Sequence, residues 1–137
     1  MMELKFRAWH KPNKIMLDLI AINFSLMQIT ADIETIKIYS ELDYWWKETD
    51  IPFSEIELMQ YTGLEDKNGK EIWEHDRVKI KGKKGEYGIG YCCGSFSAFK
   101  IDGRGATDLI DLEKLHSEVE VIGTAYDPER PFNRVSL

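Results

Sequence analysis

The chain has 137 residues, 43% of them hydrophobic and 12% aromatic, with a formal net charge of −6 at pH 7. This composition excludes an intrinsically disordered chain, and the length suffices to bury a core without a disulfide or a structural metal. The two cysteines, Cys92 and Cys93, are adjacent, which argues against a disulfide framework or a tetrahedral zinc site. We therefore expect a reduced intracellular protein in which one of the two cysteines packs in the core.

The sequence predicts neither a signal peptide nor a membrane span. Residues 1–13 mix charged and apolar side chains and lack the apolar region that secretory signals have. The most apolar run, residues 15–29, is interrupted by Asp18, Asn23 and Gln28 and is too short to cross a bilayer. We expect no membrane association.

The N-terminal part of the chain predicts strands. Residues 4–9 alternate between apolar and basic side chains, which is the period of a half-buried strand. A turn follows at Pro12-Asn13. Residues 15–24 predict a second strand, with Ile20, Ile22 and Phe24 on one face. A helix over residues 16–28 is the alternative, because the same apolar residues also fit a helical face.

A third strand is predicted over residues 35–39, where apolar and polar side chains alternate again. Pro52 disfavours helical geometry in the residue before it. We therefore place a boundary there, between an N-terminal portion, residues 1–52, and a second portion, residues 53–137. The two portions can equally form one intimate domain.

The stretch from residue 59 to residue 81 predicts a compact β unit. Residues 59–61 form a short strand that ends at Thr62-Gly63. Asn68-Gly69 is the strongest turn signal in the chain, since both residue types tolerate a positive φ. Residues 77–81 alternate strictly between basic and apolar side chains, which predicts a strand with a wet outer face.

The C-terminal part predicts three more strands and a short helix. The strands are expected over residues 86–91, 96–101 and 119–123. Asp108 is the predicted cap of a short helix that ends at Leu115.

Three motifs are distinctive: Phe-Arg-Ala-Trp at residues 6–9, the long stretch at residues 59–80 around Asp-Lys-Asn-Gly-Lys-Glu, and Glu-Val-Ile-Gly at residues 120–123. Together they resemble the YopX family of phage and prophage proteins. The resemblance implies a small β-rich, phage-encoded protein with a partly SH3-like barrel, acting in the bacterial cytoplasm. It carries over no catalytic or binding residue. His75 stands where the family pattern has glycine, and Thr124 where it often has asparagine, which leaves the geometry of both turns open.

The charges are unevenly distributed along the chain. Residues 32–57 contain eight acidic side chains and two basic ones, whereas residues 67–84 contain seven basic side chains and three acidic ones. This distribution suits head-to-tail contact between like subunits at least as well as it suits nucleic acid. A solvated edge strand protected by lysines is the simplest interpretation. The candidate nucleic-acid-binding residues are Lys67, Lys70, Arg77, Lys79, Lys81, Lys83 and Lys84.

Two further groups of residues are candidates for function. Tyr44, Trp45 and Trp46 are candidate partner-binding residues, because Trp and Tyr are enriched at interfaces, although aromatic residues of a small protein more often pack in its core. The run from Glu74 to Asp76 contains the groups needed for acid–base chemistry or metal binding. The favoured interpretation is a polar turn in which Asp76 accepts hydrogen bonds from backbone amides.

The sequence therefore predicts a mainly β (α+β) fold, with an N-terminal β or α/β portion followed by a small SH3-like barrel. We expect no catalytic residues, no metal and no cofactor. The expected function is that of a non-enzymatic phage or prophage accessory protein that forms a homo-oligomer or binds a phage or host protein. The alternative is a nucleic-acid-binding module that uses the basic face of residues 67–84.

Overall fold

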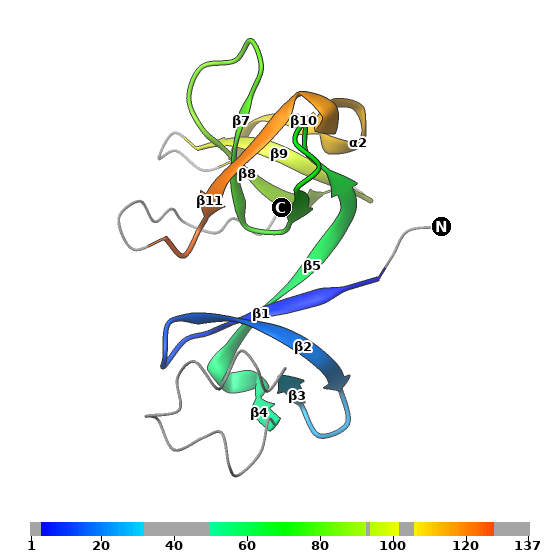
Figure 1. The fold of residues 1–137 in the computed structure, drawn as a ribbon, viewed down its shortest axis with the longest axis vertical. Helices are drawn as coiled ribbons and strands as arrows, with labels where there is room; N and C mark the ends of the chain where they lie inside the picture. Colours follow the sequence, from blue (N-terminus) through cyan, green and yellow to red (C-terminus); the bar gives the residue numbers. More distant parts are fainter. Residues whose placement is uncertain (1–3, 32–49, 93, 102–105, 128–137) are drawn as a thin grey trace. The chain divides into compact units, whose positions relative to one another are not determined.

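The computed structural model describes residues 4–31, 50–92, 94–101 and 106–127 (Figure 1). In these ranges the chain is mainly β and forms two sheets with antiparallel pairings, which confirms the predicted fold class at that level. The described residues fall into two compact units, here called the N-terminal and C-terminal units. The first runs from Lys5 to Met59, and the second comprises Leu4 and the residues from Gln60 onward. That two portions divide after residue 52 as separate domains stays a prediction.

The N-terminal unit is an antiparallel meander of four strands, and a fifth strand lies beside the first. Its elements are β1 (Phe6–His10), β2 (Ile15–Asn23), β3 (Gln28–Ala31), β4 (Asp50–Pro52), the 3₁₀ turn η2 (Phe53–Glu55) and the first part of β5 (Ile56–Glu65). Neighbouring strands follow the order β4-β3-β2-β1-β5. Residues 15–23 form a strand, so the helical alternative is wrong. The strand predicted over residues 35–39 lies outside the described residues.

A small apolar core holds the N-terminal unit together. The alternating side chains of β1, β2 and β3 supply it, because every second residue of a strand points to the same face. Its buried members are Ala8, Ile15, Leu17, Ile29, Ala31 and Ile56. Burying a side chain of the size of Leu17 stabilises the fold by roughly 1.5–3 kcal/mol.

The C-terminal unit contains a second sheet. Its elements are the end of β5, β6 (Glu71–Trp73), β7 (Asp76–Ile80), β8 (Tyr87–Cys92), β9 (Ser95–Ile101), β10 (Ala106–Asp111), α2 (Leu112–Leu115), the 3₁₀ turn η3 (His116–Glu118) and β11 (Val119–Thr124). Five strands are ordered β10-β9-β8-β7-β11, and β6 pairs with β5. In the described residues no pairing joins β10 to β11, so the sheet is not closed.

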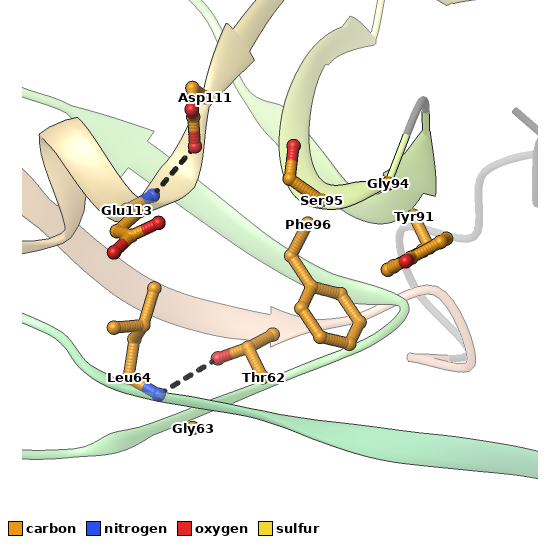
Figure 2. Close-up of a pocket in the computed structure, with 9 residues that line it drawn as sticks. All are labelled: Thr62, Gly63, Leu64, Tyr91, Gly94, Ser95, Phe96, Asp111 and Glu113. Carbon is orange, nitrogen blue, oxygen red and sulfur yellow. Dashed lines mark hydrogen bonds between the residues drawn. The ribbon is translucent and has the colours of Figure 1, made fainter. Parts of the chain in front are cut away.

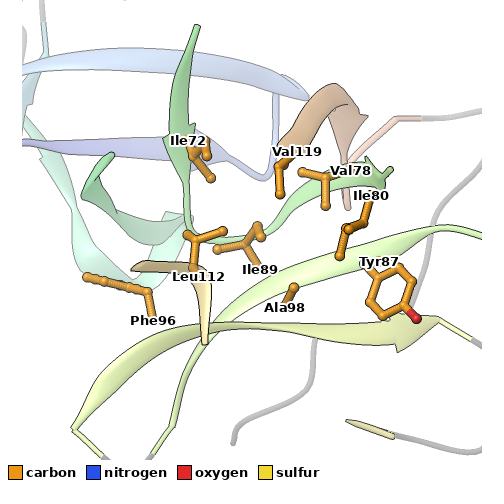
Figure 3. Packing of buried hydrophobic residues seen from close by; sticks show 9 residues of the cluster. All are labelled: Ile72, Val78, Ile80, Tyr87, Ile89, Phe96, Ala98, Leu112 and Val119. Carbon is orange, nitrogen blue, oxygen red and sulfur yellow. The ribbon is translucent and has the colours of Figure 1, made fainter. Parts of the chain in front are cut away.

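The alternation of β7 is the feature that fixes this sheet. Val78 and Ile80 are buried and Lys79 is exposed, as the period-2 pattern predicts. Figure 3 shows the two apolar side chains packed in one cluster with residues of β6, β8, β9, β11 and α2. The members of this cluster are Ile72, Val78, Ile80, Tyr87, Ile89, Phe96, Ala98, Leu112 and Val119.

Two local predictions are corrected by the structure. β5 does not end at Thr62-Gly63 but continues to Glu65, through an irregularity described below. The short helix α2 is capped by Asp111, whose side chain accepts a hydrogen bond from the Glu113 N–H, and not by Asp108. Residue 108 lies instead in β10, because pairing with β9 extends the strand farther than the local sequence indicates.

Candidate functional site

The C-terminal unit contains a pocket of about 320 Å³. Figure 2 shows its wall, built from the bulged part of β5, the β8–β9 hairpin and the start of α2. The lining residues are Thr62, Gly63, Leu64, Tyr91, Gly94, Ser95, Phe96, Asp111 and Glu113. They are distant in sequence, and no sequence motif identifies them as a group.

One wall of the pocket is a bulge in β5. The strand pairs Tyr61 with Trp73 and Glu65 with Glu71, so four steps along β5 match two steps along β6. Gly63 accommodates the extra residues with a φ of 83°, which a residue with a Cβ rarely adopts. The Thr62 hydroxyl fixes the bulge: it donates to the Ile72 carbonyl at 2.7 Å and accepts from the Leu64 N–H at 3.2 Å. The bulge thereby turns Leu64 toward the pocket.

An aromatic pair forms a second wall. The rings of Tyr91 and Phe96 meet edge to face, with centroids 5.1 Å apart. Phe96 is buried, whereas Tyr91 is 49% exposed. Gly94, with a φ of 87°, turns the chain between the two strands that carry them. The pair therefore offers an apolar surface that remains accessible at one side.

Carboxylates form the third side of the pocket. Asp111 is half-buried and Glu113 is exposed. The Glu113 N–H donates to Asp111 Oδ1 at 3.1 Å, which orients Asp111 at the start of α2. The pocket thus combines an aromatic and aliphatic wall with two negative charges at its rim.

The long motif of residues 59–80 serves the framework of the fold. Asp66 is buried, and its Oδ1 accepts hydrogen bonds from the N–H groups of Asn68 and Lys70 at 2.8 and 2.9 Å. Gly69 follows with a φ of 80°, which confirms the predicted turn. Burial raises the pKa of Asp66, but the backbone hydrogen bonds from Val121, Lys70 and Asn68 together lower it by more. The pKa therefore lies below its usual value.

The run from Glu74 to Asp76 is the polar turn that the sequence favoured. Asp76 Oδ2 accepts a hydrogen bond from the Trp73 N–H at 2.8 Å, and His75 has a φ of 67°. Glu74 Oε1 accepts from the Gln60 N–H at 2.6 Å. Burial raises the pKa of Glu74, and that hydrogen bond opposes the shift. No cluster of three or more metal-ligating side chains occurs in the part of the chain that the structure describes.

Arg77 does not belong to an exposed basic face, which corrects the residue set proposed for nucleic acid. Its side chain is 6% exposed, and it forms ion pairs with Glu86 (Nε to Oε1, 2.8 Å) and Asp127 (Nη2 to Oδ2, 3.2 Å). Glu86 immediately precedes β8, and Asp127 lies in the turn after β11. The alternating pattern of β7 gave no sign of either.

The remaining basic residues of that set lie on the surface. The exposed ones are Lys67, Lys70, Lys79, Lys81, Lys83 and Lys84. Lys67 Nζ lies 3.1 Å from Glu120 Oε2, in an ion pair that is about half exposed on both sides. Lys70 lies in the turn before β6, whereas Lys79, Lys81, Lys83 and Lys84 lie at the end of β7 and in the loop to β8. The role of these lysines in binding nucleic acid stays a prediction.

Two other groups of predicted residues lie wholly or partly outside the described ranges. Tyr44, Trp45 and Trp46, the candidate partner-binding residues, lie outside the described residues. Cys92 is half-buried at the end of β8, and Cys93 also lies outside them. The expectations for these residues stay predictions.

The β2–β3 hairpin exposes a group of large apolar side chains for which the sequence analysis proposed no role. Seven large hydrophobic residues are exposed in the described ranges, and four of them are in residues 20–27. They are Ile20 (65% exposed), Phe24 (71%), Leu26 (65%) and Met27 (61%). The unbroken apolar pair Leu26-Met27 in a turn is a signal that could have identified them.

This hairpin tip is held in a defined conformation. Asn23 Oδ1 accepts a hydrogen bond from the Leu26 N–H at 3.0 Å, and Met27 has a φ of 53°. The Met27 carbonyl accepts from the Phe53 N–H at 2.8 Å. The rings of Phe24 and Phe53 meet edge to face, with centroids 6.0 Å apart. The apolar side chains are therefore presented by an ordered turn.

The described fold is that of a small, mainly β protein with two sheets. The profile of the family described as "YopX protein" matches residues 5–130. The chain therefore belongs to the YopX family, which confirms the resemblance seen in the sequence.

One solved structure shares this fold over nearly the whole chain. The crystal structure of protein EF1440 from Enterococcus faecalis aligns with a TM-score of 0.55 and 23% sequence identity. The alignment covers 92% of this chain and 95% of that one. No curated protein matches the chain significantly. None of the helices within the described ranges is long and apolar enough to span a membrane.

Proposed function

We propose that this YopX-family chain is a non-enzymatic accessory protein, of a phage or prophage in the bacterial cytoplasm, that acts by binding protein. Its first partner is a second copy of itself. The observation that supports this proposal is the β2–β3 hairpin, where Phe24, Leu26 and Met27 at the tip and Ile20 within β2 are each more than 60% exposed. Exposed large apolar residues that lie close together mark interaction surfaces, and Phe24, Leu26 and Met27 share one four-residue turn.

The turn that carries these side chains is ordered without a partner, which favours binding. The hydrogen bond between Asn23 and Leu26, together with the contact of Phe24 with Phe53, holds the turn before any partner arrives. A surface that is already ordered loses less conformational entropy on association. The acidic stretch of residues 32–57 and the basic stretch of residues 67–84 give two copies of the chain complementary charge in a head-to-tail arrangement.

The C-terminal unit is proposed to be an SH3-like barrel. A meander from β7 to β10, then a short helical segment, then β11 pairing with β7 supports it. This fold is an architecture and by itself specifies no activity.

Light scattering over a range of protein concentrations tests the binding proposal. We expect the wild-type mass to rise with concentration, and the variant Phe24→Ser/Leu26→Ser to remain a monomer. The control is Leu109→Ser, which removes a 50% exposed leucine from β10 and should leave association unchanged. A wild-type chain that stays monomeric at every concentration contradicts self-association.

The second candidate function is nucleic-acid binding through the loop after β7. Lys79, Lys81, Lys83 and Lys84 are all exposed there, which is the observation that favours it. Binding by such lysines should weaken steeply as salt is added, and the variant Lys79→Glu/Lys81→Glu/Lys83→Glu should abolish it. Gel shifts at low salt that show no complex rule this function out.

A further inference from the structure

We infer that the pocket of the C-terminal unit binds a cationic side chain of a polypeptide, with a preference for arginine. The aliphatic stem of that side chain packs against Phe96, and its charged group lies at Asp111 and Glu113. The inference deepens the proposed protein-binding role and rests on it in one respect: it takes the ligand to be part of a protein. It makes no use of the β2–β3 hairpin.

The size of the pocket suits one long side chain. Its volume of about 320 Å³ lies at the lower end of the range for ligand pockets. Leu64, Phe96 and Tyr91 supply most of the apolar wall (Figure 2). Arginine and lysine bury their aliphatic stems against such surfaces while the charged head stays near water.

The charge of the rim selects a cation. Within the described residues, neither the Asp111 nor the Glu113 carboxylate forms an ion pair, and Asp111 uses one oxygen to cap α2. Two unneutralised carboxylates beside an apolar wall attract a positive group and repel an anion. A guanidinium binds a carboxylate through two parallel hydrogen bonds, which makes it a better match than an ammonium.

The exposed aromatic ring adds to the same preference. Tyr91 is 49% exposed, and its ring is fixed against Phe96 at 5.1 Å. A guanidinium stacks on a tyrosine face through cation–π attraction. A metal ion is a poorer ligand for this site, because it needs several converging oxygen or nitrogen donors and no such cluster of three occurs within the described residues.

Hydrogen bonds within the fold hold the walls of the pocket in place before a ligand binds. The Thr62 hydroxyl holds the β5 bulge through the Ile72 carbonyl, and Asp111 is held at the start of α2. A site that is formed before binding retains more of its interaction energy as affinity.

The experiment is an NMR titration of the full-length protein with N-acetyl-arginine amide, followed by the amide signals of the pocket. The neutral, near-isosteric probe is N-acetyl-citrulline amide. We expect saturable shifts of the signals of Leu64, Ser95 and Glu113 with the arginine probe. The citrulline probe should bind at least about threefold more weakly, since it lacks the charge that the carboxylates attract.

Two variants test the assigned residues. Glu113→Gln and Asp111→Asn should each weaken the arginine probe by about threefold or more, and Asn retains the capping role at α2. The control is Glu118→Gln, an exposed glutamate of η3 outside the pocket, which should bind like the wild type. Thermal unfolding of each variant verifies that it is folded.

Several results would overturn the inference. They are no saturable shift at the pocket, equal binding of both probes, or equal loss of binding in Glu118→Gln and Glu113→Gln. Light scattering on the same samples separates this outcome from the proposed self-association, because either can fail while the other holds. Loss of self-association in Glu113→Gln would identify a second copy of the chain as the source of the cationic side chain.

Discussion

Asp66 Oδ2 accepts a hydrogen bond at 2.9 Å from the N–H of Val121, a residue 55 positions farther along the chain. Its other oxygen accepts from Asn68 and Lys70 in its own turn. The neighbouring Lys67 N–H donates to the Val119 carbonyl at 2.9 Å. One buried carboxylate thus closes the turn between β5 and β6 and joins it to β11.

Replacing Asp66 with alanine leaves three backbone N–H groups without their acceptor. Charge-assisted hydrogen bonds of this kind stabilise a protein by roughly 1.5–3 kcal/mol each, and a buried unsatisfied donor has a similar cost. We expect Asp66→Ala to lower the free energy of unfolding by about 3 kcal/mol. Urea denaturation at pH 7 measures this loss. A change below about 0.5 kcal/mol, the size of an ordinary surface substitution, would contradict the role given to Asp66.

The lowered pKa of Asp66 predicts an acid sensitivity with a defined sign. Because the pKa is lower in the folded state than the usual value of 3.8, the ionised carboxylate stabilises the fold fully at pH values above that usual value. This contribution is lost as the pH falls through the folded-state pKa. Denaturation from pH 6 downward should show the gap between wild type and Asp66→Asn shrinking below about pH 4. A constant gap would show that the ionised form is not the stabilising one.

Arg77 is expected to stabilise the fold and not to bind a ligand. In the variant Arg77→Met the Glu86 side chain, 15% exposed, loses its cation. Breaking such a buried pair destabilises a protein by about 3 kcal/mol. The matched control is Lys79→Met, on the exposed side of the same strand, which should change stability by less than about 0.5 kcal/mol. Equal losses in thermal or urea unfolding would contradict the distinction between the two positions.

Gly123 is predicted to be intolerant of a methyl group because of Arg77 and Asp127. A Cβ at this position would overlap Asp127 Oδ2 and lie 2.9 Å from Arg77 Nη2. We expect Gly123→Ala to cost about 2 kcal/mol through overpacking. The double variant Gly123→Ala/Asp127→Ala should lose less than the sum of the two single variants, since the second change removes the overlapping atom. Simple additivity in urea unfolding would argue against the contact.

The parts of this fold that follow local rules could be predicted from the sequence. Alternation at residues 77–81 gave the strand β7 and its buried Val78 and Ile80, and Asn68-Gly69 gave the turn at Gly69. His75, which replaces the glycine of the family pattern, does adopt a positive φ of 67°. In each of these cases the determining atoms lie within a few residues of one another.

The parts that depend on distant residues could not be predicted. The alternating pattern predicted that Arg77 points to solvent like the neighbouring lysines. It does not, because Glu86 and Asp127 form ion pairs with it only in the folded chain. The bulge in β5 is set by the short partner strand β6, and the pocket draws on residues from five separate elements and a turn. The exposure of Phe24 could not be predicted from the sequence either, since an apolar residue in a strand pattern normally indicates a buried face.

The central claim, that the chain binds protein through the tip of the β2–β3 hairpin, is tested most directly by hydrogen exchange at two protein concentrations. Mass spectrometry of the exchanged protein should show protection that rises with concentration and is greatest over residues 20–27, and the Phe24→Ser/Leu26→Ser variant should lose that increase. Exchange over residues 20–27 that is the same at both concentrations, or an increase confined to the lysines of residues 79–84, would contradict it.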